Sequence, residues 1–400
     1  MPKRDLAATP VADPDASTLR VCTDPGDIDA AAWDALVEEQ PSATPFVSIA
    51  YLRALHASGS AIAETGWAPH FLLLEQTGSL LAACPLYLKD HSYGEYVFDW
   101  AWADAYRRHG LDYYPKLVDA VPFTPVPGPR LLARTHAHRV ALLRGMERLA
   151  GSAGLSSAHL LFVDELDRAA ALEAGWSMRS TVQFHWQNRA PEPYGNFAEF
   201  LASLQREKRK KIQQERRRVA DAGVTFTAAE GDAIGADDWA FFYRCYTLTY
   251  RAHHSSPYLT RDFFSRMATT MPANWLLFTA WRNGERIACS MIVIDPQRKT
   301  AFGRYWGATE HVSCLHFDAC YYVPLAWCID HGYRRFEGGA QGEHKMARGL
   351  LPVQTWSAHW LAHPQFARAI DDFLEREGHG IAVYLDELNE RRPFKAETPA

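Results

Sequence analysis

The chain has 400 residues, of which 48% are hydrophobic and 22% charged, and it contains 13 Trp, 17 Tyr and 20 Phe. This composition excludes a disordered or fibrous protein, and the length exceeds what one hydrophobic core usually holds. The formal net charge of −5 excludes a protein that is basic as a whole and would coat nucleic acid or an anionic membrane. We therefore expect a globular protein of two domains.

Cysteine usage and the N-terminus indicate a reducing compartment. None of the seven cysteines stands in a Cys-x-x-Cys pair, so the sequence predicts neither a disulfide framework nor a zinc ribbon. In residues 1–18, Lys3 and Arg4 are followed by residues such as Ala, Pro and Asp. This pattern predicts a disordered leader and no signal peptide. No apolar run reaches the roughly 20 residues that cross a bilayer. We expect a cytoplasmic protein.

The first half is predicted to contain helices around a hairpin. Apolar residues at helical spacing mark helices over 27–40 and 49–57. Strand-like runs at 71–75 and 80–88 flank Thr77-Gly78-Ser79, a turn signal. A further helix around 140–149 and a strand at 159–163 follow.

Aromatic residues alternate at Tyr96, Phe98, Trp100 and Trp102. In an extended segment these four side chains share one face of a sheet. Large aromatic side chains dominate protein interiors, so packing in the core is favoured over a substrate-lining wall.

The segment 189–196 contains Pro191, Pro193 and Gly195 and is predicted to separate two domains, at 19–190 and 191–400. Beyond it the order of helix, hairpin, helix and strand repeats. Strands at 275–281 and 286–294 flank Asn283-Gly284, and a third covers 299–307.

A helix is predicted from Ser313, as its N-cap, to His331. Gly332 is expected to end this helix in the left-handed conformation. Pro324 lies inside it and is expected to kink it, because proline lacks an N–H to donate.

Residues 206–218 carry eight basic and two acidic side chains, a local net charge of +6. Phe197, Leu201, Leu204, Ile212 and Val219 keep helical spacing through this region, so we expect one amphipathic helix. Two interpretations remain open: an anchor for the phosphates of RNA, a nucleotide coenzyme or a lipid carrier, and a solvated charged face.

The segment Phe336–Gly349 combines glycines with ionisable side chains. A strand ending at Phe336 leads into a loop whose glycines let backbone N–H groups approach an anion or a developing oxyanion. Glu343, His344, Lys345 and Arg348 supply a base, a proton shuttle and two cations. A functional loop is favoured over a structural turn.

Two other patterns are weaker. Arg304-Tyr305-Trp306-Gly307-Ala308 partly resembles the turn with which acetyltransferases hold the coenzyme A pyrophosphate, although Thr309 breaks the match. Phosphate binding there would use amides at the following helix start, near Cys314 and Leu315. The histidines of this half show no zinc-ligand spacing, so no metal is expected.

Long blocks of the sequence together resemble the bacterial FemAB-like family of predicted N-acyltransferases, also described as peptidoglycan biosynthesis or recognition proteins. The resemblance extends from about Pro45 to Glu377. The blocks include Pro45-Phe46-Val47-Ser48, Ser92-Tyr93-Gly94-Glu95-Tyr96, Tyr113-Tyr114-Pro115-Lys116, Arg304-Tyr305-Trp306-Gly307, Cys320-Tyr321-Tyr322 and Gly339-Ala340-Gln341-Gly342-Glu343-His344-Lys345.

The resemblance implies an α/β (α+β) protein with two tandem acetyltransferase-like (GNAT) domains and mixed sheets. It also implies an acyl- or aminoacyltransferase acting on an amine, with a cell-wall precursor as one acceptor. The coiled-coil arm that the Fem enzymes use for tRNA is absent, which leaves the basic helix as its substitute.

We expect an amine to attack a thioester or aminoacyl ester in a cleft at the opened edge of the second sheet. An alkylamine is protonated at neutral pH, so a base is required. Glu343 assisted by His344 is the first choice, with Glu337 and Asp318 as alternative bases. Tyr305 is expected to protonate the leaving group, with Tyr321 in reserve.

The remaining candidates bind ligands. Cofactor contacts are expected from Arg304, Gly307, Gly338, Gly339, Gln341 and Gly342. Substrate contacts are expected from Lys345, Arg348, Tyr321, Tyr322, His316 and Trp306, and the alternative role of the charged groups among them is a structural ion pair.

Three hypotheses for the activity follow, in this order. An acyl-CoA is the favoured co-substrate. The second is transfer from aminoacyl-tRNA, held by Lys208, Arg209, Lys210, Lys211, Arg216 and Arg217. The third is a noncatalytic protein that binds a cell-wall precursor.

Overall fold

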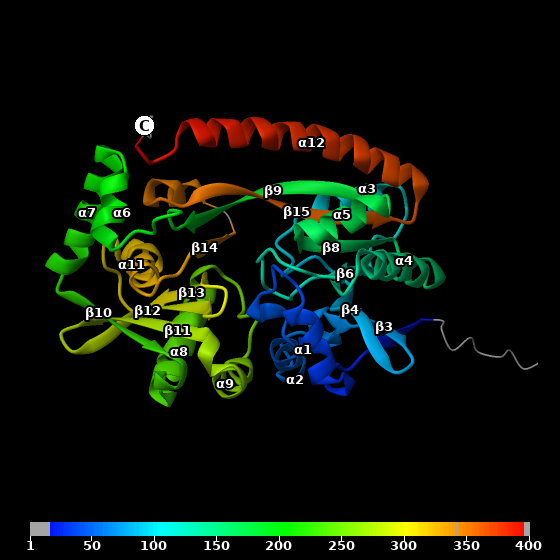
Figure 1. The fold of residues 1–400 in the computed structure, drawn as a ribbon, viewed down its shortest axis with the longest axis horizontal. Coiled ribbons are helices and arrows are strands. Elements are labelled where there is room, and N and C mark those ends of the chain that lie inside the picture. Colours follow the sequence, from blue (N-terminus) through cyan, green and yellow to red (C-terminus); the bar gives the residue numbers. More distant parts are fainter. Residues whose placement is uncertain (1–16, 341, 396–400) are drawn as a thin grey trace, which may run out of the picture.

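The computed structural model describes residues 17–340 and 342–395, and most of its strands belong to one mixed sheet (Figure 1). That sheet has eleven strands in the order β10-β11-β12-β13-β14-β9-β15-β8-β6-β5-β2, and a second sheet has the order β1-β3-β4-β7. Most of the leader predicted for residues 1–18 lies outside the described residues.

The first half contains the following elements: β1 (Thr18–Cys22), α1 (Ala30–Glu38), α2 (Ile49–Ala57), β2 (Ala68–Pro69), β3 (Phe71–Gln76), β4 (Ser79–Cys84), β5 (Leu86–Lys89), α3 (Trp100–Arg108), β6 (Lys116–Asp119), β7 (Leu132–Ala133), α4 (His136–Ser152), β8 (Ser157–Val163), α5 (Glu165–Glu173) and β9 (Ser177–Gln187).

The second half contains these: α6 (Phe197–Ser203), α7 (Arg206–Asp221), β10 (Val224–Glu230), α8 (Ala236–Ala252), α9 (Arg261–Thr270), β11 (Trp275–Arg282), β12 (Glu285–Asp295), β13 (Thr300–Ala308), α10 (Leu315–Phe317), the π-helical turn η6 (Asp318–Tyr322), α11 (Val323–Asp330), β14 (Arg335–Ala340), the 3-10 segment η7 (Glu343–Arg348), β15 (Leu351–Leu361) and α12 (Pro364–Glu390).

Each half has two helices, then antiparallel strands, and one parallel pair of strands joined through a helix. The parallel pairs are β6 with β8 in the first half and β13 with β14 in the second. The predicted α/β tandem fold with mixed sheets is therefore confirmed. The division predicted between residues 190 and 191 falls in the connection from β9 to α6.

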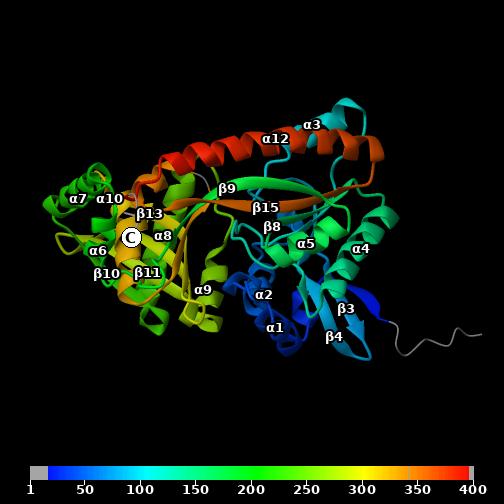
Figure 2. The ribbon, with the colours of Figure 1, turned by 45° about the horizontal axis from the view of Figure 1, so that its top comes forward.

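The sheet is continuous across that connection. Strand β9 of the first half pairs with both β14 and β15 of the second, and β15 also pairs with β8. Helix α12 packs along β9 and β15 (Figure 2), where Arg179 donates two hydrogen bonds of 2.7 Å to the Glu377 carboxylate.

Both predicted hairpin turns are confirmed. Asn283 and Gly284 have φ of 53° and 80°, and Thr77 and Gly78 have 47° and 79°. Two successive residues of positive φ match the right-handed twist of the strands they join.

The prediction that the aromatic residues 96–102 form an extended segment is wrong. Tyr96 has a φ of 61° in a loop, and α3 begins at Trp100. Tyr96, Phe98 and Trp100 are 37%, 53% and 42% exposed, whereas Trp102 is buried. The alternation therefore reflected a loop and a helix start in place of a strand buried in the core.

The helix predicted from Ser313 contains a π-helical turn. Its N-cap is Cys314, with a φ of 67°, where Ser313 was expected. The turn η6 ends two residues before Pro324, where the widened backbone suits a residue without an N–H. Gly332 ends the helix as predicted, with a φ of 68°.

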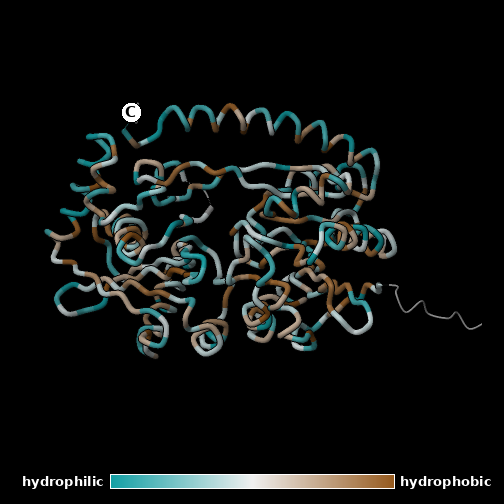
Figure 3. Tube along the Cα trace, in the orientation of Figure 1, coloured by the Kyte–Doolittle hydropathy of each residue, from teal (hydrophilic) through white to brown (hydrophobic). Residues whose placement is uncertain are grey.

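The basic segment and the residues before it form two helices where one was predicted. The helix is interrupted at Leu204 and Gln205, between α6 and α7. Helix α7 docks through Ile212, Glu215 and Val219 and turns most of its cations outward. Over the described ranges, no helix is long and apolar enough to cross a membrane, and Figure 3 shows α12 as mainly hydrophilic.

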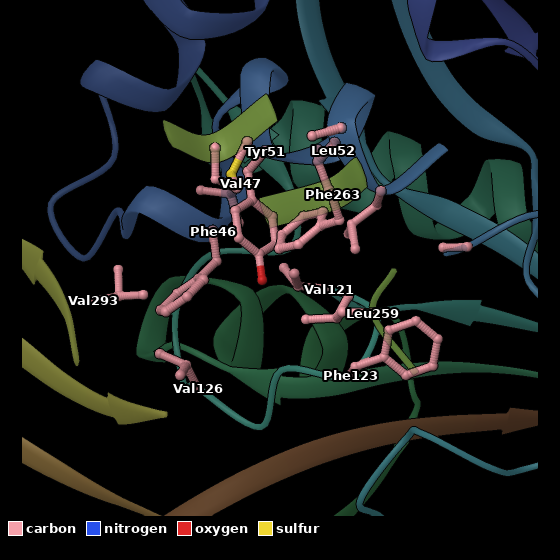
Figure 4. Close-up of a cluster of buried hydrophobic side chains, with 14 of the residues drawn as sticks. Phe46, Val47, Tyr51, Leu52, Val121, Phe123, Val126, Leu259, Phe263 and Val293 are labelled. Carbon is pink, nitrogen blue, oxygen red and sulfur yellow. The ribbon is translucent and has the colours of Figure 1, made fainter. Parts of the chain in front are cut away.

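One hydrophobic cluster joins the two halves (Figure 4). Phe46, Tyr51 and Val121 of the first half pack with Phe263 and Val293 of the second. The same Phe46 ring also meets Phe302 of β13 edge-on at 5.2 Å between centroids. Burying apolar side chains from both halves in one core fixes the halves against each other.

We expect Phe46→Ala to lower the free energy of unfolding by about 3 to 5 kcal/mol, because a ring that is 1% exposed leaves a cavity behind. Phe98→Ala is the matched control, with an expected change within about 0.5 kcal/mol because that ring is exposed. Urea denaturation followed by circular dichroism measures both. Equal losses in the two variants would contradict a core shared by the halves.

Candidate active site between strands β13 and β14

The parallel strands β13 and β14 pair over a short stretch and then separate. Three residue pairs join them, from Thr300 with Arg335 to Phe302 with Glu337. Beyond this point β13 follows β12 through a bulge, and Gly338 and Gly339 lie where the register of β14 against β9 shifts. The backbone groups of these glycines thus face an opening in the sheet.

Two cavities meet at this opening and share Gly303, Arg304, Tyr305, Trp306 and Gly338. Cavity A, of about 360 Å³, faces the first half and is also lined by Tyr96, Phe123, Tyr246, Tyr250 and Gly339. Cavity B, of about 130 Å³, lies on the other face and is also lined by Ser290, Ile292, His316, Cys320, Tyr321 and Phe336.

Several predicted site residues are brought together here. Arg304, Tyr305 and Trp306 line both cavities, and His316 and Tyr321 line cavity B. The Tyr321 hydroxyl lies 3.3 Å from Nε2 of His344. Burial, with Arg348 and Lys345 nearby, lowers the pKa of His344, so its imidazole is neutral at pH 7.

Glu343 lies elsewhere. Its side chain is 51% exposed, accepts a 2.7 Å hydrogen bond from the Tyr384 hydroxyl and lies 3.9 Å from the Arg391 guanidinium. These contacts point it to α12, and it lines neither cavity. Gln341 is outside the described residues, and Gly342, with a φ of 112°, precedes η7.

Glu337 is the buried carboxylate at the point where the strands separate. It is 3% exposed, and its Oε1 lies 2.9 Å from the Arg335 guanidinium. Among the described residues Oε2 has no hydrogen-bond partner, since Nε2 of His185 is 3.9 Å away. Burial raises the pKa of Glu337 to about 7, although Arg335 and Arg304 oppose the shift.

Glu337 lines neither cavity A nor cavity B, but it lines a larger cleft of about 920 Å³ between the halves. The third predicted carboxylate, Asp318, lies in η6 with its Oδ1 3.4 Å from Nε of Arg216. Burial raises the pKa of Asp318 to about 6. Asp318 lines neither cavity A nor cavity B, so it pairs with α7 instead.

The cations of η7 are buried in the fold. Arg348, 2% exposed, lies 3.1 Å from the Glu215 carboxylate and 3.6 Å from the Phe317 ring centre. The Tyr322 hydroxyl donates to the same carboxylate. Lys345 donates a 3.0 Å hydrogen bond to the Gly339 carbonyl, and burial lowers the pKa of Lys345 to about 8. Arg348 thus ties η7 to α7, and Tyr322 ties η6 to the same helix.

The segment predicted as a coenzyme A turn is part of strand β13. A Cβ on Gly307 would lie 2.1 Å from the Cys245 carbonyl oxygen, so this glycine lets α8 approach the strand. The Trp306 carbonyl accepts a 2.6 Å hydrogen bond from Thr249 of α8. Packing therefore explains Gly307.

Sequence reasoning missed the aromatic wall of cavity A. Tyr96 and Phe123 come from loops of the first half, and Tyr246 and Tyr250 come from α8. Helical spacing in α8 signals a buried face but not which cavity that face borders. No group of three metal-ligating side chains occurs within residues 17–340 and 342–395.

Two halves of this topology, with cavities where two parallel strands part, define a tandem acetyltransferase-like protein. A family model described as FemAB-like, peptidoglycan biosynthesis/recognition, matches residues 25–396. The chain belongs to this family. No curated protein matches the sequence.

Solved structures share the fold at low identity. FemX is 10% identical, with 86% of this chain and 98% of that chain covered and a TM-score of 0.53. The L-PGS structure from Bacillus licheniformis is 12% identical, with coverages of 86% and 97% and a TM-score of 0.51. A conserved protein of unknown function from Bacteroides thetaiotaomicron is 11% identical, with 86% and 100% coverage and a TM-score of 0.51.

We expect Arg348→Met to cost about 3 to 5 kcal/mol in the free energy of unfolding, because it leaves the Glu215 carboxylate buried without its cation. Arg217→Met, on the exposed face of α7, is the control and should change stability by no more than about 0.5 kcal/mol. Adding Glu215→Gln to Arg348→Met should restore part of the loss, measured by urea denaturation. No recovery in the double variant would argue against the buried pair.

Proposed function

We propose that the protein is an N-acyltransferase that moves an acyl or aminoacyl group from an activated, phosphate-bearing donor to an amine, with a cell-wall precursor as the acceptor class. The observation that carries this proposal is the opening between β13 and β14. A cavity lies on each side of this opening, and the two cavities share lining residues. The buried Glu337 carboxylate lines the adjoining cleft on one side, and a Tyr–His pair lies on the other. Membership in the FemAB-like family supports the class of acceptor.

The donor is assigned to the side of cavity B. Helix α7 contacts both η6 and η7, and η6 contributes Cys320 and Tyr321 to the lining of cavity B. Arg206, Lys210, Lys211, Arg217 and Arg218 are exposed on α7. Such a cationic face suits the phosphates that coenzyme A and tRNA have in common.

The acceptor is assigned to the side of the sheet that faces the first half, where cavity A lies and where Glu337, which lines the cleft between the halves, serves as the base. The amine nitrogen forms a bond to the acyl carbon, and Glu337 Oε2 takes the proton that the nitrogen loses. A carboxyl with a pKa of about 7 has both forms present at neutral pH, as a general base requires. This proton then passes to solvent.

The leaving group departs on the opposite face. The carbon–sulfur or carbon–oxygen bond to the donor breaks, and the Tyr321 hydroxyl gives its proton to the departing atom. Burial raises the pKa of Tyr321, so the hydroxyl is protonated, and His344 at 3.3 Å returns a proton to it from solvent. The amides of Gly338 and Gly339, which line cavity A at the register shift of β14, are suited to the oxyanion of the intermediate, at roughly 10² to 10³ in rate per donor.

We expect Glu337→Gln to lower the transfer rate by about 10² to 10⁴ and Glu343→Gln to change it by only a few-fold. In the wild type, the activity should rise with pH up to about 7, because Glu337 must lose its proton before it accepts one. The pH profile of kcat/KM should therefore bend near pH 7 in the wild type and show no bend in Glu337→Gln. A bend that persists in Glu337→Gln and is lost in Glu343→Gln would return the role of base to Glu343.

The donor is identified by two parallel assays, a thermal-shift panel of coenzyme A thioesters and filter binding of aminoacyl-tRNA. A bound donor raises the melting temperature. If the donor is tRNA, affinity should fall steeply with salt and should weaken when Lys210, Lys211 and Arg217 become Gln. The charge-matched control replaces the exposed Arg148, Arg368 and Arg376 with Gln and should leave the affinity for tRNA unchanged.

A protein that binds cell-wall precursors with no response to any donor, and with unchanged affinity in Glu337→Gln, would be a noncatalytic binder. That result would end the proposal of acyl transfer.

A further inference from the structure

Cavity A has an unusual polarity. None of its described lining residues is Asp or Glu, whereas Arg304 and His253 both line it. The rest of the wall is mainly aromatic, including Tyr246 and Tyr250, whose rings are 4.9 Å apart. A ligand of this cavity meets a cation and apolar surface together.

The guanidinium of Arg304 is only partly satisfied. Its Nη2 donates a 2.7 Å hydrogen bond to the Phe123 carbonyl and lies 3.4 Å from the Thr124 hydroxyl. Its Nε is buried without a hydrogen-bond partner among the described residues. A buried donor without an acceptor is costly, so an acceptor supplied by a ligand would be favourable there.

The Glu337 carboxylate, whose pKa the charge of Arg304 lowers, is already paired with another cation. Its salt-bridge partner is Arg335, at 2.9 Å. Both Arg304 and Glu337 face the first half, since Arg304 bonds to Phe123 and Glu337 lines the cleft with Thr44. A cationic group and a base therefore lie on the same side of the opening.

We propose that cavity A selects an acceptor bearing both an amine and a carboxylate, an amino acid or a peptide with a free carboxyl end, and that Arg304 binds this carboxylate. The planar guanidinium fork matches carboxylate geometry. The amine extends past Gly338 of the cavity wall to Glu337 in the adjoining cleft, and the aromatic wall holds the apolar part of the ligand. The expectation that the ligand carries an amine rests on the proposed acyl transfer, whereas the expectation that it carries a carboxylate does not.

The test compares matched pairs of probes, the standard amino acids and several dipeptides against their C-terminal carboxamides, by calorimetry without a donor. We expect the wild type to bind at least one acid about tenfold or more tightly than its carboxamide, the range of a hydrogen-bonded charge. Arg304→Gln should abolish the preference, and Arg304→Lys should keep part of it. With a donor, the same preference should appear in KM.

Arg298→Gln is the matched control, because Arg298 also donates across the halves, to the Gln40 carbonyl at 3.4 Å, but does not line cavity A. It should keep the preference for the acid. Thermal melts show whether Arg304→Gln is folded, and if it is not, the comparison rests on Arg304→Lys and on the wild-type preference.

The inference is overturned if no acid is preferred, if the preference survives Arg304→Gln, or if inorganic phosphate displaces the acid at equal concentration, which would assign the site to a phosphate. Failure of the proposed function looks different: no amine is acylated by any donor, while acids still bind better than carboxamides.

Discussion

The separation of β13 from β14 is the constraint on which the site depends. Parallel strands that stayed paired to their ends would fill the middle of the sheet with hydrogen bonds and leave no passage between its faces. Here the pairing ends at Phe302 and Glu337, and both cavities begin at the next residues. Glu337 is buried yet accessible from one side because it stands at that last pair.

Close packing keeps the strands apart. A Cβ on Gly338 would lie 2.5 Å from the Leu350 side chain and 3.2 Å from the Phe184 carbonyl oxygen, so the backbone of β14 is pressed against β9 and the chain after η7. On the other strand, Gly307 lets α8 approach to a distance that a side chain would block. The opening is thus held by contacts on its outer flanks.

Much of the fold could be predicted because its signals are local. Asn283-Gly284 fixed a hairpin, and Gly332 ended a helix, since positive φ at these positions is a property of a few neighbouring residues. Pro324 was expected to kink its helix, whereas the structure places the π-helical turn η6 just before it and Pro324 in the first turn of α11. The aromatic alternation at 96–102 failed because a loop and a helix start can mimic the period of a strand.

The site was predicted as a region more successfully than as a set of roles. Glu337 and Glu343 stand six residues apart in the same glycine-rich run, and only the pairing of β14 with β13 and β9 decides which one is buried. The Arg304–Ala308 pattern looked like a phosphate-binding turn because its glycine is required, but the requirement comes from Cys245, some sixty residues earlier. Charge alone likewise did not distinguish Arg348, which forms a buried ion pair, from Arg304, which lines the cavities.

The placement of β9 between β14 and β15 bears on how this molecule can move. A rigid-body swing of one half against the other would have to break a ladder of main-chain hydrogen bonds, so hinge opening is not a low-cost route for ligand entry. Severing the polypeptide near residue 190 and expressing the fragments alone would leave β14 and β15 with bare edges, prone to self-association. Entry to the interior therefore falls to side-chain rotation and to surface loops, on a faster timescale than relative motion of the halves.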